Sequence, residues 1–220
     1  MTQIFSLLKA SIVFGTVILF GALGEILTEK SGNLNLGVPG IMYLGGIAGL
    51  TGSFLYENAS AAPNALVGLM IALACALAAS TLAGLLYCFL TTTLRTNQNV
   101  TGLTLTIFGS GVANLYGGAL NQMAGGVGQI SVASTSSGFR ATLPFLSNVG
   151  VFSGLGFMVY LAILLAVVIS YFLNRTRRGL NLRAVGENPA TADAAGISVG
   201  KYKYIAICIG SAITGLGGLY

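Results

Sequence analysis

The stretch ALVGLMIALACALAASTLAGLLYCFLTT, residues 65–92, contains no charged side chain. A helix needs about 20 predominantly apolar residues to cross the hydrocarbon core of a bilayer. The stretch is longer than that, and it lacks the strict alternation of apolar and polar residues that marks a strand of a membrane barrel. It therefore predicts a tilted membrane-spanning helix.

The composition of the whole chain supports the same environment. Hydrophobic residues make up 55% of the 220 residues and charged residues 7%, and the mean hydropathy is +0.86. A soluble domain usually carries about 25% charged residues. So few charges cannot cover a water-facing surface, and the composition excludes a soluble domain. The net charge of +5 does not indicate nucleic-acid binding, because the charges are not interleaved with aromatic residues.

Five further apolar runs surround this stretch. They cover about residues 7–27, 36–55, 100–120, 151–173 and 204–220. Because helices satisfy their own backbone groups in lipid, the runs predict an all-α, polytopic transmembrane bundle of about six spans, in one domain over residues 1–220. The last run is still apolar at Tyr220, so we expect a C-terminally truncated part of a longer protein. Residues 121–150, rich in Gly and Ser, are too polar to span.

Glycine is abundant, with 32 residues, and in membranes small residues let helix backbones approach closely. Gly45 and Gly49 have the four-residue spacing of such a contact. The sequence predicts tight helix packing.

Basic residues are distributed unevenly among the links. If successive links between spans lie on opposite sides of the membrane, eight basic residues fall on one side: Lys30, Arg95, Arg175, Arg177, Arg178, Arg183, Lys201 and Lys203. Only Lys9 and Arg140 fall on the other side. Positive charge favours the cytoplasmic side, so we expect a cytoplasmic loop over residues 174–203 and an external N-terminus.

Chemistry-bearing residues are few. The chain has no His, and Cys75, Cys88 and Cys208 lie in apolar runs, so we expect free thiols and no metal site. The G-x-x-x-x-G-K-[ST] phosphate loop is missing from the sequence. We expect a chain that is not an enzyme and that holds no cofactor itself.

The basic loop contains AVGENPATADAAGI, residues 184–197. Asn188 is a favoured N-cap, and Pro189 suits the first helical position. Gly196 suits the left-handed position after a helix. A helix this short is marginal alone in water, so we expect a partner surface that holds it. The alternative is an ordinary cytoplasmic loop that is well capped.

Three segments resemble one transporter family. GLNLRAVGENPATADAAGISVGKYKY, residues 179–204, resembles the cytoplasmic coupling segment of ABC-importer permeases of the branched-chain amino acid, simple-sugar and nucleoside family, with Thr191 where Ala is commoner. GEILTEKSGNLNLGVPGIMYLGG, residues 24–46, and RTNQNVTGLTLTIFGSGVANL, residues 95–115, resemble two further segments of that family. These two are closest to the nucleoside and simple-sugar branch, whose members use a basic membrane lipoprotein.

The resemblance implies a permease subunit whose short helix docks on a separate ATPase. The residues implied for coupling are Arg183, Gly186, Glu187, Asn188, Pro189, Ala192, Asp193 and Gly196. It also implies ABC ATPase subunits that bind ATP and magnesium, a second permease, the same or homologous, and an extracytoplasmic solute-binding lipoprotein. The location would be a bacterial plasma (inner) membrane.

Polar and aromatic residues near the span starts are candidates for the translocation path: Asn33, Asn35, Tyr43, Thr101 and Asn114. The break at Pro39 and Gly40 is typical of a discontinuous transporter helix. Turn capping, hydrogen bonds between helices and aromatic core filling are the alternatives. Glu25 and Glu29 fit an interfacial role. The lack of deep charge favours a neutral cargo such as a nucleoside or simple sugar, with a branched-chain amino acid as the alternative.

Two other classes stay open. An ion-coupled secondary transporter would need intramembrane ionisable groups and inverted repeats, and we find neither in the sequence. A membrane scaffold would lack a polar cavity.

Overall fold

The computed structural model describes residues 2–126, 130, 132–139 and 155–220. The helices are α1 (Thr2–Lys30), α2 (Val38–Ala59), α3 (Ala65–Cys88), α4 (Gln98–Met123), α5 (Ala133–Phe139), α6 (Phe157–Arg175), α7 (Arg177–Glu187), α8 (Pro189–Ala194) and α9 (Val199–Leu219). A π-helical turn, η1 (Phe89–Thr93), continues α3. No strand occurs in these described residues.

The prediction of an all-α bundle with six spans is confirmed. Within the described residues six helices are long and apolar enough to cross a membrane: α1, α2, α3 with η1, α4, α6 and α9. The predicted bounds differ from the observed ones at several ends. The last span begins at Val199 rather than near residue 204, and the fifth begins at Phe157, while residues 151–154 lie outside the described part.

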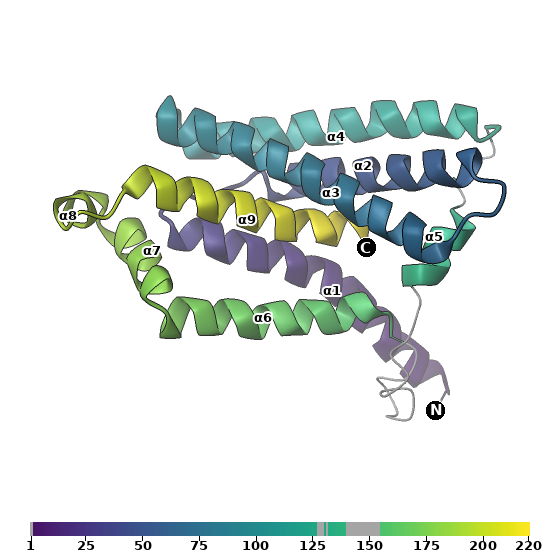
Figure 1. Ribbon diagram of the computed structural model, residues 1–220, viewed down its shortest axis with the longest axis horizontal. Helices are drawn as coiled ribbons and strands as arrows, with labels where there is room; N and C mark the ends of the chain where they lie inside the picture. Colours follow the sequence, from purple (N-terminus) through teal and green to yellow (C-terminus); the bar gives the residue numbers. More distant parts are fainter. Residues whose placement is uncertain (1, 127–129, 131, 140–154) are drawn as a thin grey trace.

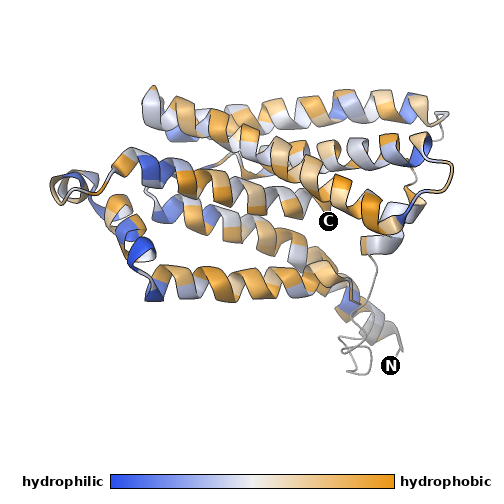
Figure 2. Cartoon of the chain, in the orientation of Figure 1, coloured by the Kyte–Doolittle hydropathy of each residue, from blue (hydrophilic) through white to orange (hydrophobic). Residues whose placement is uncertain are grey.

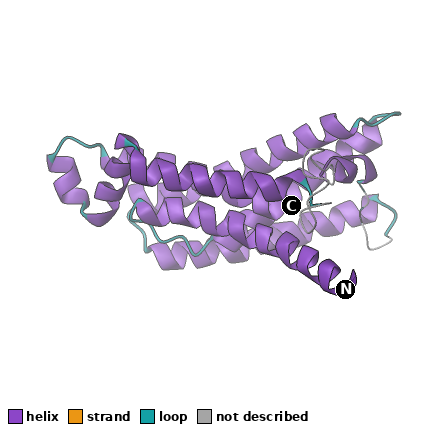
Figure 3. Ribbon diagram, turned by 90° about the horizontal axis from the view of Figure 1, so that it is seen from below, coloured by secondary structure: helices purple, strands orange, loops and turns teal. Residues whose placement is uncertain are grey.

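Helix α9 occupies the centre of the bundle. It packs against α1, α2 and α3, while α4 lies outside α2 and α6 lies outside α1 (Figure 1). Seen from below, the spans run side by side along the long axis, and the loops gather at the two ends (Figure 3). Helix α9 is accordingly the most buried of the six spans, and α4 is the least.

Small residues allow this central position. A Cβ on Gly45 of α2 would lie 2.9 Å from Gly215 Cα of α9, and a Cβ on Gly218 would collide with the backbone of Met42. Gly210 meets α1 in the same way, at the carbonyl of Gly24. These close approaches bear out the predicted tight helix packing.

Most of the basic residues collect at one end of the bundle. Figure 2 shows apolar colour along the spans and hydrophilic colour on α7 and at the start of α9. The end of α1, η1, the end of α6 and the start of α9 all lie at this end, which α8 extends (Figure 1). The eight basic residues assigned to one side by charge alternation belong to these elements and their links.

Candidate functional site

Helix α8 has a defined start. Asn188 is its N-cap, with an extended backbone, and its Oδ1 accepts a hydrogen bond of 3.1 Å from the backbone N–H of Thr191. Pro189 occupies the first helical position, where its missing N–H leaves no bond unmade. The residues predicted for this start are found in these roles.

The end of α8 is defined equally well. Gly196 has a φ of +80°, the left-handed conformation that a Cβ disfavours. Its N–H donates to the carbonyl of Asp193 at 2.9 Å, and the N–H of Ile197 donates to the carbonyl of Ala192 at 3.0 Å. This pair of bonds is a Schellman motif. Six residues of helix are thus fixed at both ends.

Helix α7, which carries α8, was not separated from the loop by the sequence analysis. Thr176 is its N-cap and joins it to α6: its hydroxyl donates to the Phe172 carbonyl at 2.6 Å and accepts from the Gly179 N–H at 3.0 Å. Leu182 and Val185, at i and i+3, are buried. That spacing together with the Thr176 cap is the signal that could have revealed α7.

The junction of α7 with the rest of the molecule is tight. A Cβ on Gly186 would collide with the carbonyl oxygen of Lys30, and a Cβ on Gly32 would lie 3.1 Å from Gly186 Cα. Asn181 Nδ2 donates to the Tyr202 hydroxyl at 3.0 Å and links α7 to α9. Helix α7 therefore contacts three spans or their ends.

The eight residues predicted for coupling fall in one unit made of α7, α8 and the Schellman turn. Ala192 alone among them is buried, at 3% exposure, and it anchors α8. Arg183 and Gly186 are partly buried on the α7 side, and among the described residues Arg183 Nε has no hydrogen-bond partner. The other five are exposed: Glu187, Asn188, Pro189, Asp193 and Gly196.

The link between α1 and α2, residues 31–37, begins with backbone bonds from Ser31, Gly32 and Asn33 to the last turn of α1, and its middle is held by side chains. The N–H groups of Leu34 and Asn35 donate to Gln98 Oε1 and Glu25 Oε1, both at 2.9 Å. In the other direction, Tyr87 donates to the Leu34 carbonyl at 2.7 Å. Irregular backbone is tolerated near lipid only where protein groups satisfy it, and α1, α3 and α4 supply those groups here.

Asn33 and Asn35, two of the predicted path residues, lie inside this link. Asn35 Oδ1 accepts the Gly37 N–H at 2.9 Å and forms the turn before α2. Asn33 is 1% exposed, and its Nδ2 donates to Thr91 Oγ1 in the π-helical turn at 3.2 Å. Each side chain thus has one structural partner, while the buried Asn33 Oδ1 has none among the described residues.

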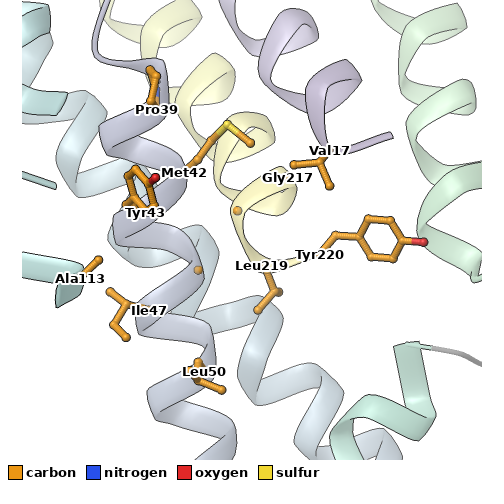
Figure 4. Close-up of a pocket in the computed structure, with 12 residues that line it drawn as sticks. Val17, Pro39, Met42, Tyr43, Ile47, Leu50, Ala113, Gly217, Leu219 and Tyr220 are labelled. Carbon is orange, nitrogen blue, oxygen red and sulfur yellow. The ribbon is translucent and has the colours of Figure 1, made fainter. Parts of the chain in front are cut away.

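The other three path candidates lie apart from the link. Tyr43 lines a cavity of about 630 Å³ together with residues of α4 and the last turn of α9 (Figure 4). Thr101 lines a second cavity, of about 470 Å³, between η1 and α4. Asn114 is exposed on α4. The structure therefore does not bring the five candidates into one cavity.

Sequence reasoning missed the partners that clamp the link. Tyr87 and Gln98 were not singled out. Thr106, one of the polar residues at the start of the fourth span, donates to the Leu36 carbonyl at 2.9 Å. The signal in the sequence is a tyrosine within an apolar span, because its hydroxyl needs a hydrogen-bond partner when it is buried. Tyr87 is 0% exposed in the structure. Cys75, Cys88 and Cys208 are free thiols, as expected.

Comparison with known proteins decides the family. The model of the family described as "Branched-chain amino acid transport system / permease component" matches residues 7–220. The chain belongs to this permease family.

Individual permeases are similar in sequence to this protein over nearly its whole length. The putative glucose ABC transporter permease protein TsgC13 of Haloferax volcanii is 32% identical over 97% of this chain and 61% of its own length. The guanosine ABC transporter permease protein NupQ of Bacillus subtilis is 30% identical over 98% of the chain and 67% of its own length. The nucleoside ABC transporter permease protein NupC of Lactococcus lactis is 30% identical, with coverages of 94% and 64%. The chain thus spans about two thirds of these relatives. No solved structure matches it.

Proposed function

We propose that the chain is a membrane-spanning permease subunit of an ATP-driven (ABC) importer, and that α8 is its contact with a separate ATPase subunit. The observation that carries this proposal is the unit of α7 and α8, in which a short helix is capped at both ends and exposed on every side but that of Ala192. A rigid helix transmits displacement better than a flexible loop. Membership of the permease family supports the same role.

The mechanical route starts at the Gly186 contact with the end of α1. A displacement of α7 moves the Lys30–Gly32 turn, because the two backbones already touch there. The adjoining link leads into Pro39 and Tyr43 of α2, which line the larger cavity. ATP binding would act on transport only if α8 contacts the ATPase differently in the two access states.

The proposed cargo is a small neutral polar solute, a nucleoside or a simple sugar. The names of NupQ, NupC and TsgC13 refer to nucleosides and glucose, and Tyr43 gives the cavity an exposed aromatic ring. A branched-chain amino acid is the second candidate, favoured by the description of the family. A screen of the cognate binding protein against nucleosides, sugars and branched-chain amino acids separates the two.

The proposed assembly has further components. A second permease, the same or homologous, completes the path, and two ATPase subunits bind ATP with magnesium and hydrolyse it. An extracytoplasmic lipoprotein delivers the solute. The proposed location is a bacterial plasma membrane, with residues 174–203 in the cytoplasm.

Uptake and ATPase measurements on the reconstituted importer test the proposal. Replacing Asn188 and Pro189 by Gly-Gly removes the cap and the fixed first turn, and we expect loss of cargo uptake and of cargo-stimulated ATP hydrolysis with normal membrane insertion. The matched control replaces the exposed Ala61 and Ala62 by Gly-Gly in the link between α2 and α3. Unchanged uptake in the Asn188–Pro189 variant would contradict the docking role.

A further inference from the structure

We propose that the groove between α6 and α9 is a binding site for an anionic phospholipid of the cytoplasmic leaflet. The groove has a volume of about 510 Å³. Leu27 of α1 forms part of its floor, and α6 and α9 form its two walls. Figure 1 shows α1 between these two helices, which is the arrangement that keeps the walls apart.

Most of the groove is apolar. Val168 of α6 and Ile205 and Ile209 of α9 line it and are 51%, 59% and 50% exposed. No described residue covers them. Because these side chains belong to spans, hydrocarbon rather than water is the medium that meets them.

One end of the groove is basic. Arg178 at the start of α7 and Lys201 in the first turn of α9 line it, together with Ser198 and Tyr202. Arg178 and Lys201 are both exposed, and the first turns of α7 and α9 contain no acidic residue. Helix α6 ends at Arg175 and α9 begins at Val199, so the two cations lie where the spans leave the hydrocarbon.

The dimensions fit one leaflet. Twelve residues separate Lys201 from Ile213 at the deep end, which is about 18 Å of helix at a rise of 1.5 Å per residue. Half of the hydrocarbon core is about 15 Å. A phosphate at the basic end thus places an acyl chain along the apolar walls.

Charge decides the class of lipid. The positive-inside rule alone explains basic residues in a cytoplasmic loop, but it does not explain why two of them lie at the mouth of an apolar groove between spans. Basic pockets of this kind on the cytoplasmic side bind anionic headgroups. A zwitterionic lipid fits the apolar walls equally well, but its headgroup carries no net negative charge for the two cations.

Native mass spectrometry of the full chain in detergent tests the site, with phosphatidylglycerol and phosphatidylethanolamine of identical acyl chains as probes. We expect the first phosphatidylglycerol to bind about tenfold more tightly. The Arg178→Gln/Lys201→Gln variant should lose this preference. The matched control, Arg175→Gln/Arg177→Gln, removes two exposed cations outside the groove lining and should keep it.

A second pair of variants tests the apolar walls with the charges intact. Ile209→Trp narrows the groove and should weaken phosphatidylglycerol binding several-fold, whereas Ile107→Trp on the 73%-exposed position of α4 should not. The proposal is overturned if both lipids bind equally, if the control pair loses the preference as fully as the groove pair, or if glycerol phosphate competes as well as the whole lipid. It is also overturned if a photo-crosslinker at Ile205 captures another protein segment or a second copy instead of lipid. None of these outcomes depends on ATPase docking at α8, so the lipid site and the proposed function fail separately.

Discussion

At the scale of single residues, Gly186 leaves no room for a Cβ at the junction of α7 with α1. Its α-carbon lies against the turn after α1, and a Cβ would collide with the Lys30 carbonyl. We predict that Gly186→Ala destabilises the protein by about 1–3 kcal/mol, as overpacking does, and weakens cargo-stimulated ATP hydrolysis. Thermal unfolding in detergent measures the first effect.

Gly200 supplies the control for this change. It is exposed at the start of α9, and a Cβ there meets no atom within 4 Å. Gly200→Ala should leave stability unchanged or raise it by up to about 1 kcal/mol through helix propensity. Equal melting temperatures for the Gly186 and Gly200 variants would show that the α7 junction is not tight.

The N-cap of α8 gives a second prediction at this scale. Asn188→Ala removes the acceptor of the Thr191 N–H and should lower the free energy of local unfolding of α8 by about 1 kcal/mol. The loss is local, so hydrogen exchange at the Thr191 amide should accelerate while global unfolding hardly changes. Asn188→Asp keeps the acceptor and should restore protection. Fast exchange in both variants would mean that the cap does not hold the helix.

Residue-level roles were predictable where they depend on neighbours in the chain. Asn188 and Gly196 bond to residues within three positions, Pro189 acts through its own fixed backbone, and their roles followed from capping rules. Gly186 touches Lys30, which is far away in sequence. No local rule names such a partner.

At the scale of elements, the link over residues 31–37 depends on neighbouring helices. Tyr87 of α3 donates to the Leu34 carbonyl, and this bond holds the middle of the link, beyond the last backbone bonds to α1. We predict that Tyr87→Phe leaves that carbonyl unpaired, costs about 1–3 kcal/mol and lowers uptake. Thermal unfolding and transport assays measure the two effects.

Tyr116→Phe is the matched control, because Tyr116 is 55% exposed on α4. Its thermal stability and uptake should equal those of the unmodified protein. A Tyr87→Phe variant as stable as this control would contradict the clamping of the link. The predicted break at Pro39 and Gly40 is wrong, because both residues lie in the continuous first turn of α2. The irregular backbone precedes them, and its clamps were not predicted because they come from α3 and α4 through tertiary contacts.

At the scale of the whole molecule, the number of spans followed from hydropathy, since lipid demands long apolar helices. The central place of α9 did not follow. Membrane helices meet through small residues, and with 32 glycines in the chain the sequence alone does not say which of them face one another.

The orientation gives a prediction at this scale. In a background with Cys75, Cys88 and Cys208 replaced by Ala, a single Cys at the exposed Ala190 of α8 should react with an impermeant maleimide only in inside-out vesicles. A Cys at the exposed Ala61, at the other end of the bundle, should react only in right-side-out vesicles. The reversed pattern would place α8 outside and remove its access to a cytoplasmic ATPase.

Photo-crosslinking from α8 tests the central claim most directly. A benzophenone maleimide attached to Ala190→Cys in membranes that contain the whole importer should form an adduct with the ATPase subunit, and ATP should change its yield. The same reagent at Ala61→Cys should give no such adduct. An α8 that is labelled but never crosslinks to the ATPase would contradict the account.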